Sequence, residues 1–169
     1  ALPNLIHHIT HGDPERLLMA TVVQMKVGER NFGVSAGTGT LALTLRAYRQ
    51  EDMETLERAI LDMAQTGCER AGMTWQSSRQ DVFPDTVNRP VCCVRVADIL
   101  REHHLPIQVL SEPMRWSEDF GWYLQEVPGM YLGLGAGEDH CGLHTDGYEF
   151  PDSLLEPAIQ VLETLVRAL

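Results

Sequence analysis

The chain has 169 residues, of which 44% are hydrophobic and 22% charged, and its formal net charge is −11 at pH 7. This composition is typical of a globular protein with a sizeable core, and it excludes a disordered chain. Nucleic acid is not an expected partner, because an acidic protein without a basic run repels phosphates. No apolar run approaches the ~20 residues of a membrane span.

The first residues and the cysteines bear on the compartment. The start has neither the basic leader nor the long apolar stretch of a secretory signal. Four cysteines are present, two of them adjacent, and their spacing is not that of a disulfide framework. They are Cys68, Cys92, Cys93 and Cys141. These features predict a cytoplasmic protein that is not tied to a membrane.

The N-terminal half predicts most of one small α+β unit. Apolar residues at helical spacing over residues 1–10 indicate the end of a helix. Strands are expected over Leu17–Val27 and Thr38–Tyr48, because both are rich in β-formers and the second alternates in polarity. An amphipathic helix follows over Glu51–Ala71, and a third strand over Met73–Gln80. This order gives five of the six elements of a β-α-β-β-α-β ferredoxin-like unit that lacks its first strand.

The C-terminal half alternates helices with short strands. Helices are expected over 91–104, 118–126 and 154–169, and strands over 107–110 and 130–134. Such alternation favours a mostly parallel sheet that is flanked by helices. The predicted fold class is therefore α/β with an α+β unit in front of it.

Four motifs in the C-terminal half occur in a fixed order. They are Ser117–Phe120 (SEDF), Val127–Gly129 (VPG), Leu132–Gly135 (LGLG) and Leu143–Asp152 (LHTDGYEFPD). In this order they resemble the end of the dinuclear zinc peptidases and amidohydrolases that include aminoacylase, hippurate hydrolase and succinyl-diaminopimelate desuccinylase. The resemblance implies the C-terminal part of a metal-dependent hydrolase.

The resemblance extends to the N-terminal half. The Gly-rich turn Gly28–Gly33, the strand end Thr44–Arg46 and the segment Phe83–Asn88 are similar to the lid and to its return into the catalytic domain. We therefore expect an incomplete lid and dimerisation domain over 1–80 and the C-terminal part of a catalytic domain over 81–169. The family's H-x-D pair, E-E pair and lid histidine are absent from these 169 residues, so a missing N-terminal part is an expected partner.

The resemblance implies the activity and the cofactor. Amide hydrolysis at neutral pH requires an activated water and an electrophile, and a pair of zinc ions supplies both. His144 is implied as a ligand of one of the two ions, for which cobalt or manganese can substitute. The general base lies upstream in the family, so no catalytic residue is expected in this chain, and the chain alone is expected to be inactive. The implied substrate is an N-acyl amino acid or a small dipeptide-like amide.

Four further residues are candidates near the substrate. Arg46 ends an apolar strand, and its guanidinium can hold a substrate carboxylate. Asn31 is implied as a second lid residue that reaches the substrate, although its spacing from Arg46 differs from that of the family by two residues. Glu118 and Asp119 are expected beside the metal pocket as supporting acids. As acids at a helix start they would also favour the positive end of the helix dipole.

Several alternatives remain open. His140, Cys141 and His144 form an H-C-x-x-H pattern that could hold a zinc ion by itself. His7, His8 and His11 cluster near the end of the first helix, where they also fit a solvated surface. The Gly-rich stretch 31–39 lacks the Lys-Ser/Thr ending of a phosphate-binding loop.

A function of a different class is also open. The chain could be a truncated relative that has lost catalysis and acts as a dimerising or binding module. Under either function a homodimer through the lid is expected, because the missing first strand leaves a sheet edge unpaired.

Overall fold

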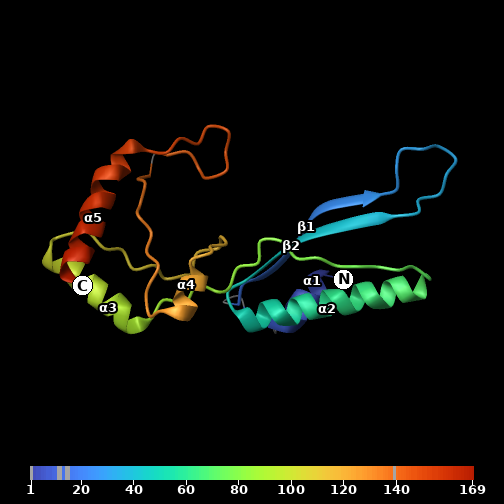
Figure 1. Ribbon diagram of the computed structural model, residues 1–169, viewed down its shortest axis with the longest axis horizontal. Helices are drawn as coiled ribbons and strands as arrows, with labels where there is room; N and C mark the ends of the chain where they lie inside the picture. Colours follow the sequence, from blue (N-terminus) through green and yellow to red (C-terminus); the bar gives the residue numbers. More distant parts are fainter. Residues whose placement is uncertain (1, 11–12, 14–15, 139) are drawn as a thin grey trace. The chain divides into compact units, whose positions relative to one another are not determined.

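The computed structural model describes residues 2–10, 13, 16–138 and 140–169. The chain divides into two compact units (Figure 1). Unit 1 comprises Ala1–Asp85 and Pro113–Glu118, and unit 2 comprises Thr86–Glu112 and Asp119–Leu169. None of the described helices is long and apolar enough to cross a membrane. Each unit is considered by itself.

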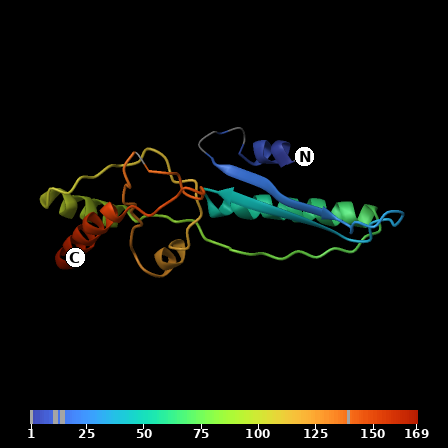
Figure 2. The same cartoon turned by 90° about the horizontal axis from the view of Figure 1, so that it is seen from above.

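Unit 1 contains the first four elements that the sequence predicts. They are helix α1 (Leu2–Thr10), strand β1 (Leu18–Val27), strand β2 (Gly39–Ala47) and helix α2 (Gln50–Arg70). The two strands form an antiparallel hairpin, which is the only sheet among the described residues. Helix α2 lies along this hairpin (Figures 1 and 2) and contacts both β2 and α1.

The hairpin contains a β-bulge that sets which side chains share a face. Val22 lies opposite Leu43, and Val23 is an extra residue without a partner on β2. Side chains alternate along a strand, so one extra residue shifts the alternation of every residue that follows. Met25 and Val27 therefore lie on the same face as Val22. Without the bulge, the polar residues next to Met25 and Val27 would lie on that face instead.

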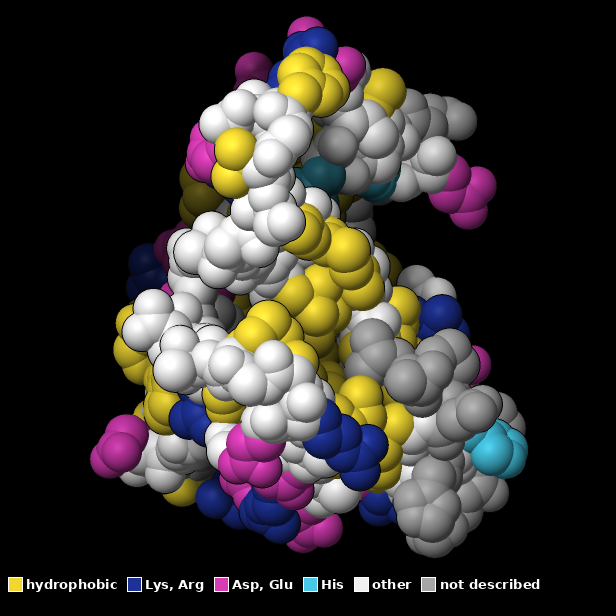
Figure 3. Space-filling view, turned by 90° about the vertical axis from the view of Figure 1, so that its right-hand side faces the viewer, with side chains coloured by type: hydrophobic (Ala, Val, Ile, Leu, Met, Phe, Trp, Pro, Cys, Tyr) yellow, Lys and Arg dark blue, Asp and Glu magenta, His cyan; other side chains and the backbone are white. Residues whose placement is uncertain are grey.

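The apolar face of the hairpin is covered over only part of its length. Leu18, at the start of β1, is 5% exposed, whereas Met25 and Val27, near the turn, are 69% and 68% exposed. Hydrophobic side chains gather across the middle of the face shown in Figure 3. Leu56 of α2 is fully buried and forms the centre of the small core of this unit.

An ion pair fixes the start of α2 to the segment that precedes β1. Both the Nε and the Nη2 atoms of Arg16 donate hydrogen bonds to the carboxylate of Asp52, and the Nε–Oδ2 distance is 3.2 Å. Asp52 is 3% exposed. The hydrogen bond raises the pKa of the Arg16 guanidinium above its ordinary value. A buried carboxylate is therefore paired with a cation, as burial of a charge requires.

The predicted third strand over Met73–Gln80 is wrong, because this stretch forms no ladder. It runs back along α2, where Trp75 Nε1 donates to Gln65 Oε1 at 2.6 Å and Arg79 Nη2 donates to Glu57 Oε2 at 2.9 Å. Local composition favours a strand, but a strand needs backbone partners. Among the described residues, this stretch meets side chains of α2 and not the backbone of another strand. The helix does end as expected, since Gly72 has a φ of +66° and Met73 N donates to Cys68 O.

Unit 2 is built mainly from helices. They are α3 (Pro90–Glu102), α4 (Gly121–Glu126), the 3₁₀ turn η1 (Asp152–Leu154) and α5 (Leu155–Ala168). The sequence predicts all three α-helices, but α4 begins three residues later than expected at Glu118. Helices α3 and α5 pack on one another. Their core consists of Val96, Ile99, Leu100 and Leu165, with Leu105, Met130, Leu132 and Val161 packed against it.

The predicted strands over 107–110 and 130–134 are also wrong as ladder elements, so the expected parallel sheet is absent from the described residues. The second stretch still behaves like a strand in its side chains, because Met130 and Leu132 both pack against the core of unit 2. A ladder requires the backbone of a neighbouring strand, and none lies beside these stretches among the described residues. The supported fold class is a mixed α/β chain with one two-stranded antiparallel sheet.

Candidate functional site

The predicted metal ligand, His144, lies at an exposed turn in the segment 140–148. The turn is closed by two hydrogen bonds. Thr145 Oγ1 donates to the carbonyl oxygen of Gly142 at 2.7 Å, and Tyr148 N donates to the carbonyl oxygen of Thr145 at 3.0 Å. These bonds fix the backbone on both sides of the imidazole. The side chain is thereby presented to solvent at a defined position.

The backbone of His144 is in an uncommon conformation. Its φ is +63°, in the left-handed region that residues other than glycine seldom adopt. Such a conformation costs free energy, and it is often retained where a side chain must be aimed at a ligand. A neutral imidazole is a good zinc ligand. The turn is therefore suited to present the imidazole of His144 as one ligand of a metal ion.

The described residues contain no group of three or more His, Cys, Asp or Glu side chains that could hold a metal ion. A self-contained H-C-x-x-H zinc site is thus not assembled by this part of the chain. His140 Nδ1 instead lies 2.7 Å from the carbonyl oxygen of Cys141. The expected cluster of His7, His8 and His11 falls partly outside the described residues. His144 of unit 2 is therefore suited to be one ligand of a metal ion, and a metal site would need further ligands.

Arg46 lies near the base of the hairpin. It sits opposite Met19 in the ladder, and its Nη1 donates to the carbonyl oxygen of Arg115 at 2.9 Å. Nearby, the hydroxyl of Tyr48 donates to the carbonyl oxygen of Pro113 at 3.3 Å. These two bonds hold the segment 113–118 against the hairpin. Arg46 is exposed and therefore accessible to a carboxylate, but it also fastens this segment.

Asn31 lies beyond the other end of the hairpin, in the exposed connection between the strands. Its backbone N–H donates to the carbonyl oxygen of Glu29 at 2.8 Å. Gly39 begins β2 and Arg46 lies seven residues further along it. At about 3.4 Å per residue these two positions are roughly 24 Å apart. One copy of the hairpin therefore does not bring Asn31 and Arg46 together.

Glu118 and Asp119 lie just before α4 and not in its first turn, which contains no acid. Asp119 accepts a backbone hydrogen bond from Trp122 N at 3.0 Å, so its carbonyl oxygen starts the helix. Glu118 is half-buried and Asp119 is exposed. Glu118 belongs to unit 1, whereas Asp119 and His144 belong to unit 2. Their expected role as acids beside the metal stays a prediction.

Asn88 makes a connection that the sequence motifs do not predict. Its Nδ2 donates to the carbonyl oxygen of Tyr131 at 2.9 Å, and Tyr131 N donates to Asn88 Oδ1 at 2.7 Å. The next residue, Arg89, donates its backbone N–H to Gly129 O at 3.0 Å. The Tyr131 ring lies 5.3 Å from that of Phe120. The one sequence feature that points to this contact is an Asn two residues before Pro90, the first residue of helix α3.

Comparisons with known proteins identify relatives of the chain. No protein-family model matches it. YhaA of Bacillus subtilis, which carries the name of an amidohydrolase, is 25% identical over 114 residues, or 67% of this chain and 29% of that protein. The N-acetyldiaminopimelate deacetylase of Limosilactobacillus fermentum is 25% identical over 134 residues, or 79% of this chain and 35% of that protein. This chain is a homologue of amidohydrolases and deacetylases.

A solved structure supports the fold. A crystal structure described as an aminohydrolase from methicillin-resistant Staphylococcus aureus matches with a TM-score of 0.71 at 21% sequence identity. The match covers 98% of this chain but 44% of that chain. The expected resemblance is confirmed: the homologues are hydrolases of amide bonds, and the chain corresponds to their C-terminal part. It spans about a third of the length of the two curated relatives described above.

Proposed function

We propose that this chain is part of a metal-dependent amidohydrolase that cleaves N-acyl amino acids or small peptide-like amides. The observations that carry the proposal are the homology to deacetylases and amidohydrolases and the turn that holds His144 at a positive φ. The homology points to the class of bond, and the turn provides a candidate donor for the metal. A longer polypeptide would supply the remaining metal donors and the general base.

Each proposed residue has a separate chemical task. Two zinc ions, or cobalt or manganese in their place, would supply an activated water and stabilise the oxyanion. His144 holds one ion through a neutral imidazole nitrogen. Arg46 pairs with the substrate carboxylate through its planar guanidinium, and Asn31 donates a hydrogen bond to the substrate. Glu118 and Asp119 orient the groups that line the pocket.

The proposed organisation follows from the same relationship. Residues 1–80 act as an incomplete lid and dimerisation domain, and residues 81–169 complete a catalytic domain in the cytoplasm. A homodimer through the lid is favoured because the two-stranded sheet has no further strand among the described residues. The separation of Asn31 from Arg46 fits this arrangement, since the two residues would then serve the sites of different copies.

A second function is a dimerising or binding module without catalysis. The exposed apolar residues near the hairpin turn favour it, since such a surface suits contact with another chain. The two functions differ in one respect. Only the hydrolase requires His144 to hold a metal.

The test joins this chain to the polypeptide that precedes it in its reading frame and measures both bound metal and hydrolysis of several N-acyl amino acids. His144→Ala should lower the rate by roughly 100-fold or more and should release metal, because loss of even a supporting residue costs 10–100-fold. His140→Ala is the matched control, since it removes another exposed imidazole from the same segment. Full activity and full metal content in His144→Ala would refute the proposed role of this residue.

A further inference from the structure

Two side chains of the hairpin hold one distant segment by its backbone. Arg46 Nη1 donates to the carbonyl oxygen of Arg115 at 2.9 Å, and the hydroxyl of Tyr48 donates to the carbonyl oxygen of Pro113 at 3.3 Å. The two donors are two residues apart, and so are the two acceptors. Successive side chains of a strand alternate in direction, so Arg46 and Tyr48 extend from the same face of the hairpin. We call this pair of bonds the 46–48 clasp.

The 46–48 clasp fixes the direction of the segment as well as its place. The donor with the lower number pairs with the acceptor with the higher number, so residues 113–115 run antiparallel to β2. The backbone of both donors is itself paired. Arg46 lies opposite Met19 in the ladder, and Tyr48 N donates to the carbonyl oxygen of Leu17 at 3.2 Å. Less conformational freedom therefore remains to be lost when these two side chains bind the segment.

The two bonds of the clasp reinforce one another. Each bond is exposed, and one exposed hydrogen bond adds little stability by itself. Both bonds act on one short segment, so the second forms at a high effective concentration once the first is in place. The ring of Pro113 fixes φ, which lowers the number of conformations that the released segment can adopt. The clasp therefore holds its segment more firmly than two bonds to separate segments would.

The clasped segment leads from one unit to the other at both of its ends. The chain enters unit 1 at Pro113 and leaves it after Glu118. The other passage between the units follows Asp85, whose Oδ2 accepts a hydrogen bond from Gln50 N at 3.4 Å. Gln50 begins α2 and lies two residues after Tyr48. The corner between β2 and α2 therefore holds the chain of unit 1 near each of its passages to unit 2.

The passage after Glu118 divides the SEDF motif. Ser117 and Glu118 belong to unit 1, whereas Phe120 belongs to unit 2, where its ring lies 5.3 Å from that of Tyr131. Arg115, which the clasp holds, lies three residues before Glu118. Three residues of fully extended chain span at most about 11 Å. The clasp therefore limits where the carboxylate of Glu118 can lie.

We propose that Tyr48 is a positioning residue of the hydrolase, which acts with Arg46 to hold 113–118 and thereby sets the position of Glu118. The inference rests on the proposed function, because Glu118 is an acid of the active site only in the hydrolase. It gives a role to Tyr48, which lies outside the sequence motifs. It also groups Glu118 with Arg46 and not with His144. Loss of the clasp should therefore impair the use of substrate and leave bound metal unchanged.

The first test measures how fast trypsin cleaves this chain after Arg115 under native conditions. Arg115 is the only Lys or Arg between Arg101 and Arg167, so this cleavage yields a fragment that begins at Trp116 and is identified by its mass. A protease cleaves a segment only after the segment has left its contacts. When opening and closing are fast, the rate reports the population of the open form. The measurement requires no hydrolytic activity of the protein.

Tyr48→Phe is the main variant, because it removes the hydroxyl donor and keeps the ring. Trp75→Phe is its matched control. It also replaces an aromatic donor of unit 1 by phenylalanine, but the lost hydrogen bond goes to Gln65 Oε1 and not to the clasped segment. Neither change adds or removes a tryptic site.

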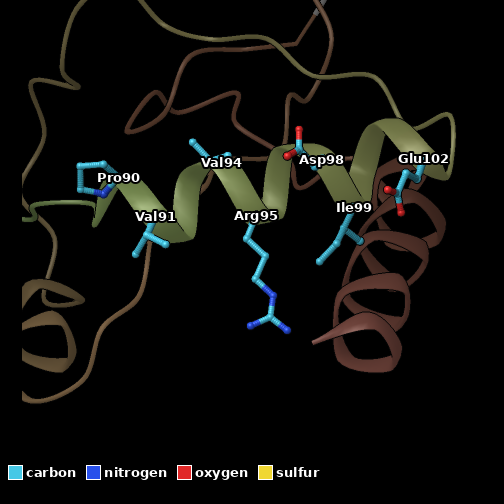
Figure 4. A pocket seen from close by; sticks show the side chains of 7 residues that line it. All are labelled: Pro90, Val91, Val94, Arg95, Asp98, Ile99 and Glu102. Atoms are coloured by element: carbon cyan, nitrogen blue, oxygen red, sulfur yellow. The ribbon is translucent and has the colours of Figure 1, made fainter.

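Arg46→Met removes the other donor of the clasp, and its matched control lies in unit 2. Arg95 extends away from helix α3 (Figure 4), and its Nη2 donates to the backbone oxygen of Leu169 at 2.9 Å. Arg46→Met and Arg95→Met thus each remove one guanidinium that bonds to a backbone oxygen. Each also removes one tryptic site and leaves the site at Arg115 intact.

Tyr48→Phe and Arg46→Met should each raise the rate of cleavage after Arg115 by about fivefold, the factor that corresponds to one hydrogen bond of typical net strength. The two changes together should raise it further. Trp75→Phe and Arg95→Met should leave the rate unchanged. An unchanged rate in Tyr48→Phe would overturn the inference, and it would leave the proposed function as it stands.

The second test uses this chain joined to the polypeptide that precedes it in its reading frame, with N-acyl amino acids as substrates. Tyr48→Phe should lower kcat/KM by at least about threefold, with the metal content unchanged and with no such loss in Trp75→Phe. In a Glu118→Gln background, Tyr48→Phe should have little further effect, because residues that act through one another are not additive. Full additivity, or loss of metal in Tyr48→Phe, would overturn the role of Tyr48.

The two tests separate failure of the inference from failure of the proposed function. Absence of hydrolysis in the unsubstituted joined protein would refute the proposed function and, with it, the role of Tyr48 in the reaction. The cleavage rates after Arg115 would still show whether Tyr48 and Arg46 hold the segment.

Discussion

Leu56 gives the sharpest test of the packing in unit 1. It is the one large side chain among the described residues that is fully buried, and it lies on α2, the helix that contacts both β2 and α1. Leu56→Ala removes three carbons from the core. At ~0.8 kcal/mol for each buried carbon group this costs about 2.4 kcal/mol, and the cavity left behind can raise the cost to about 5 kcal/mol. Such a loss is a large fraction of the stability of a small domain.

The measurement is urea denaturation of the chain, followed by circular dichroism, with hydrogen exchange of individual peptides to locate the effect. The midpoint should fall, and the faster exchange should be confined to unit 1. Met63→Ala is the matched control, because Met63 lies on the same helix but is 43% exposed. Equal shifts of the midpoint for the two variants would show that Leu56 is not the centre of this core.

Two further predictions concern the hairpin and the ion pair. Gly28→Ala should destabilise the chain more than Gly33→Ala, as measured by urea denaturation. Both glycines have a positive φ, which costs other residues about 1–2 kcal/mol, but only at Gly28 would the new Cβ lie 2.8 Å from the Cβ of Ala36. Asp52→Asn should also lower the urea midpoint, because it leaves Arg16 without its carboxylate while keeping the shape of the side chain. An unchanged midpoint would mean that the pair contributes nothing to stability.

The helices could be predicted from the sequence because their signals are local. Apolar residues at helical spacing predict α2 and α5, and Gly72 stops α2 where expected. The α4 start was placed too early at Glu118, because acids before a helix resemble acids in its first turn. An acid interacts favourably with the helix dipole at either position, so this interaction does not tell them apart.

The missed strands have a different cause. Met73–Gln80 and 130–134 have the composition of strands, but pairing depends on residues that are distant in the sequence or outside it. The side-chain amide of Asn88 pairs with the backbone of Tyr131, and no periodicity predicts such a contact. The sequence predicts the two strands of the hairpin, but not the extra residue at Val23. Two adjacent valines give no sign of which one leaves the ladder.

The sequence names residues for the candidate site, but it does not give their geometry. The motif around His144 identifies the residue, but the left-handed backbone and the closing bonds of Thr145 became visible only in the structure. The expected approach of Asn31 and Arg46 to the substrate depends on contacts between copies or with other segments. Sequence motifs identify such residues singly, and they do not fix distances between them.

The bulge at Val23 has a consequence for how related hairpins are compared. It separates β1 into two halves in which the residues of the apolar face have even numbers before the bulge and odd numbers after it. A relative without the extra residue would need a gap of one position there for Met25 and Val27 to align with residues of its apolar face. An ungapped alignment would match them with positions on the opposite face, and the apolar face of the distal half would look lost in a protein that has kept it.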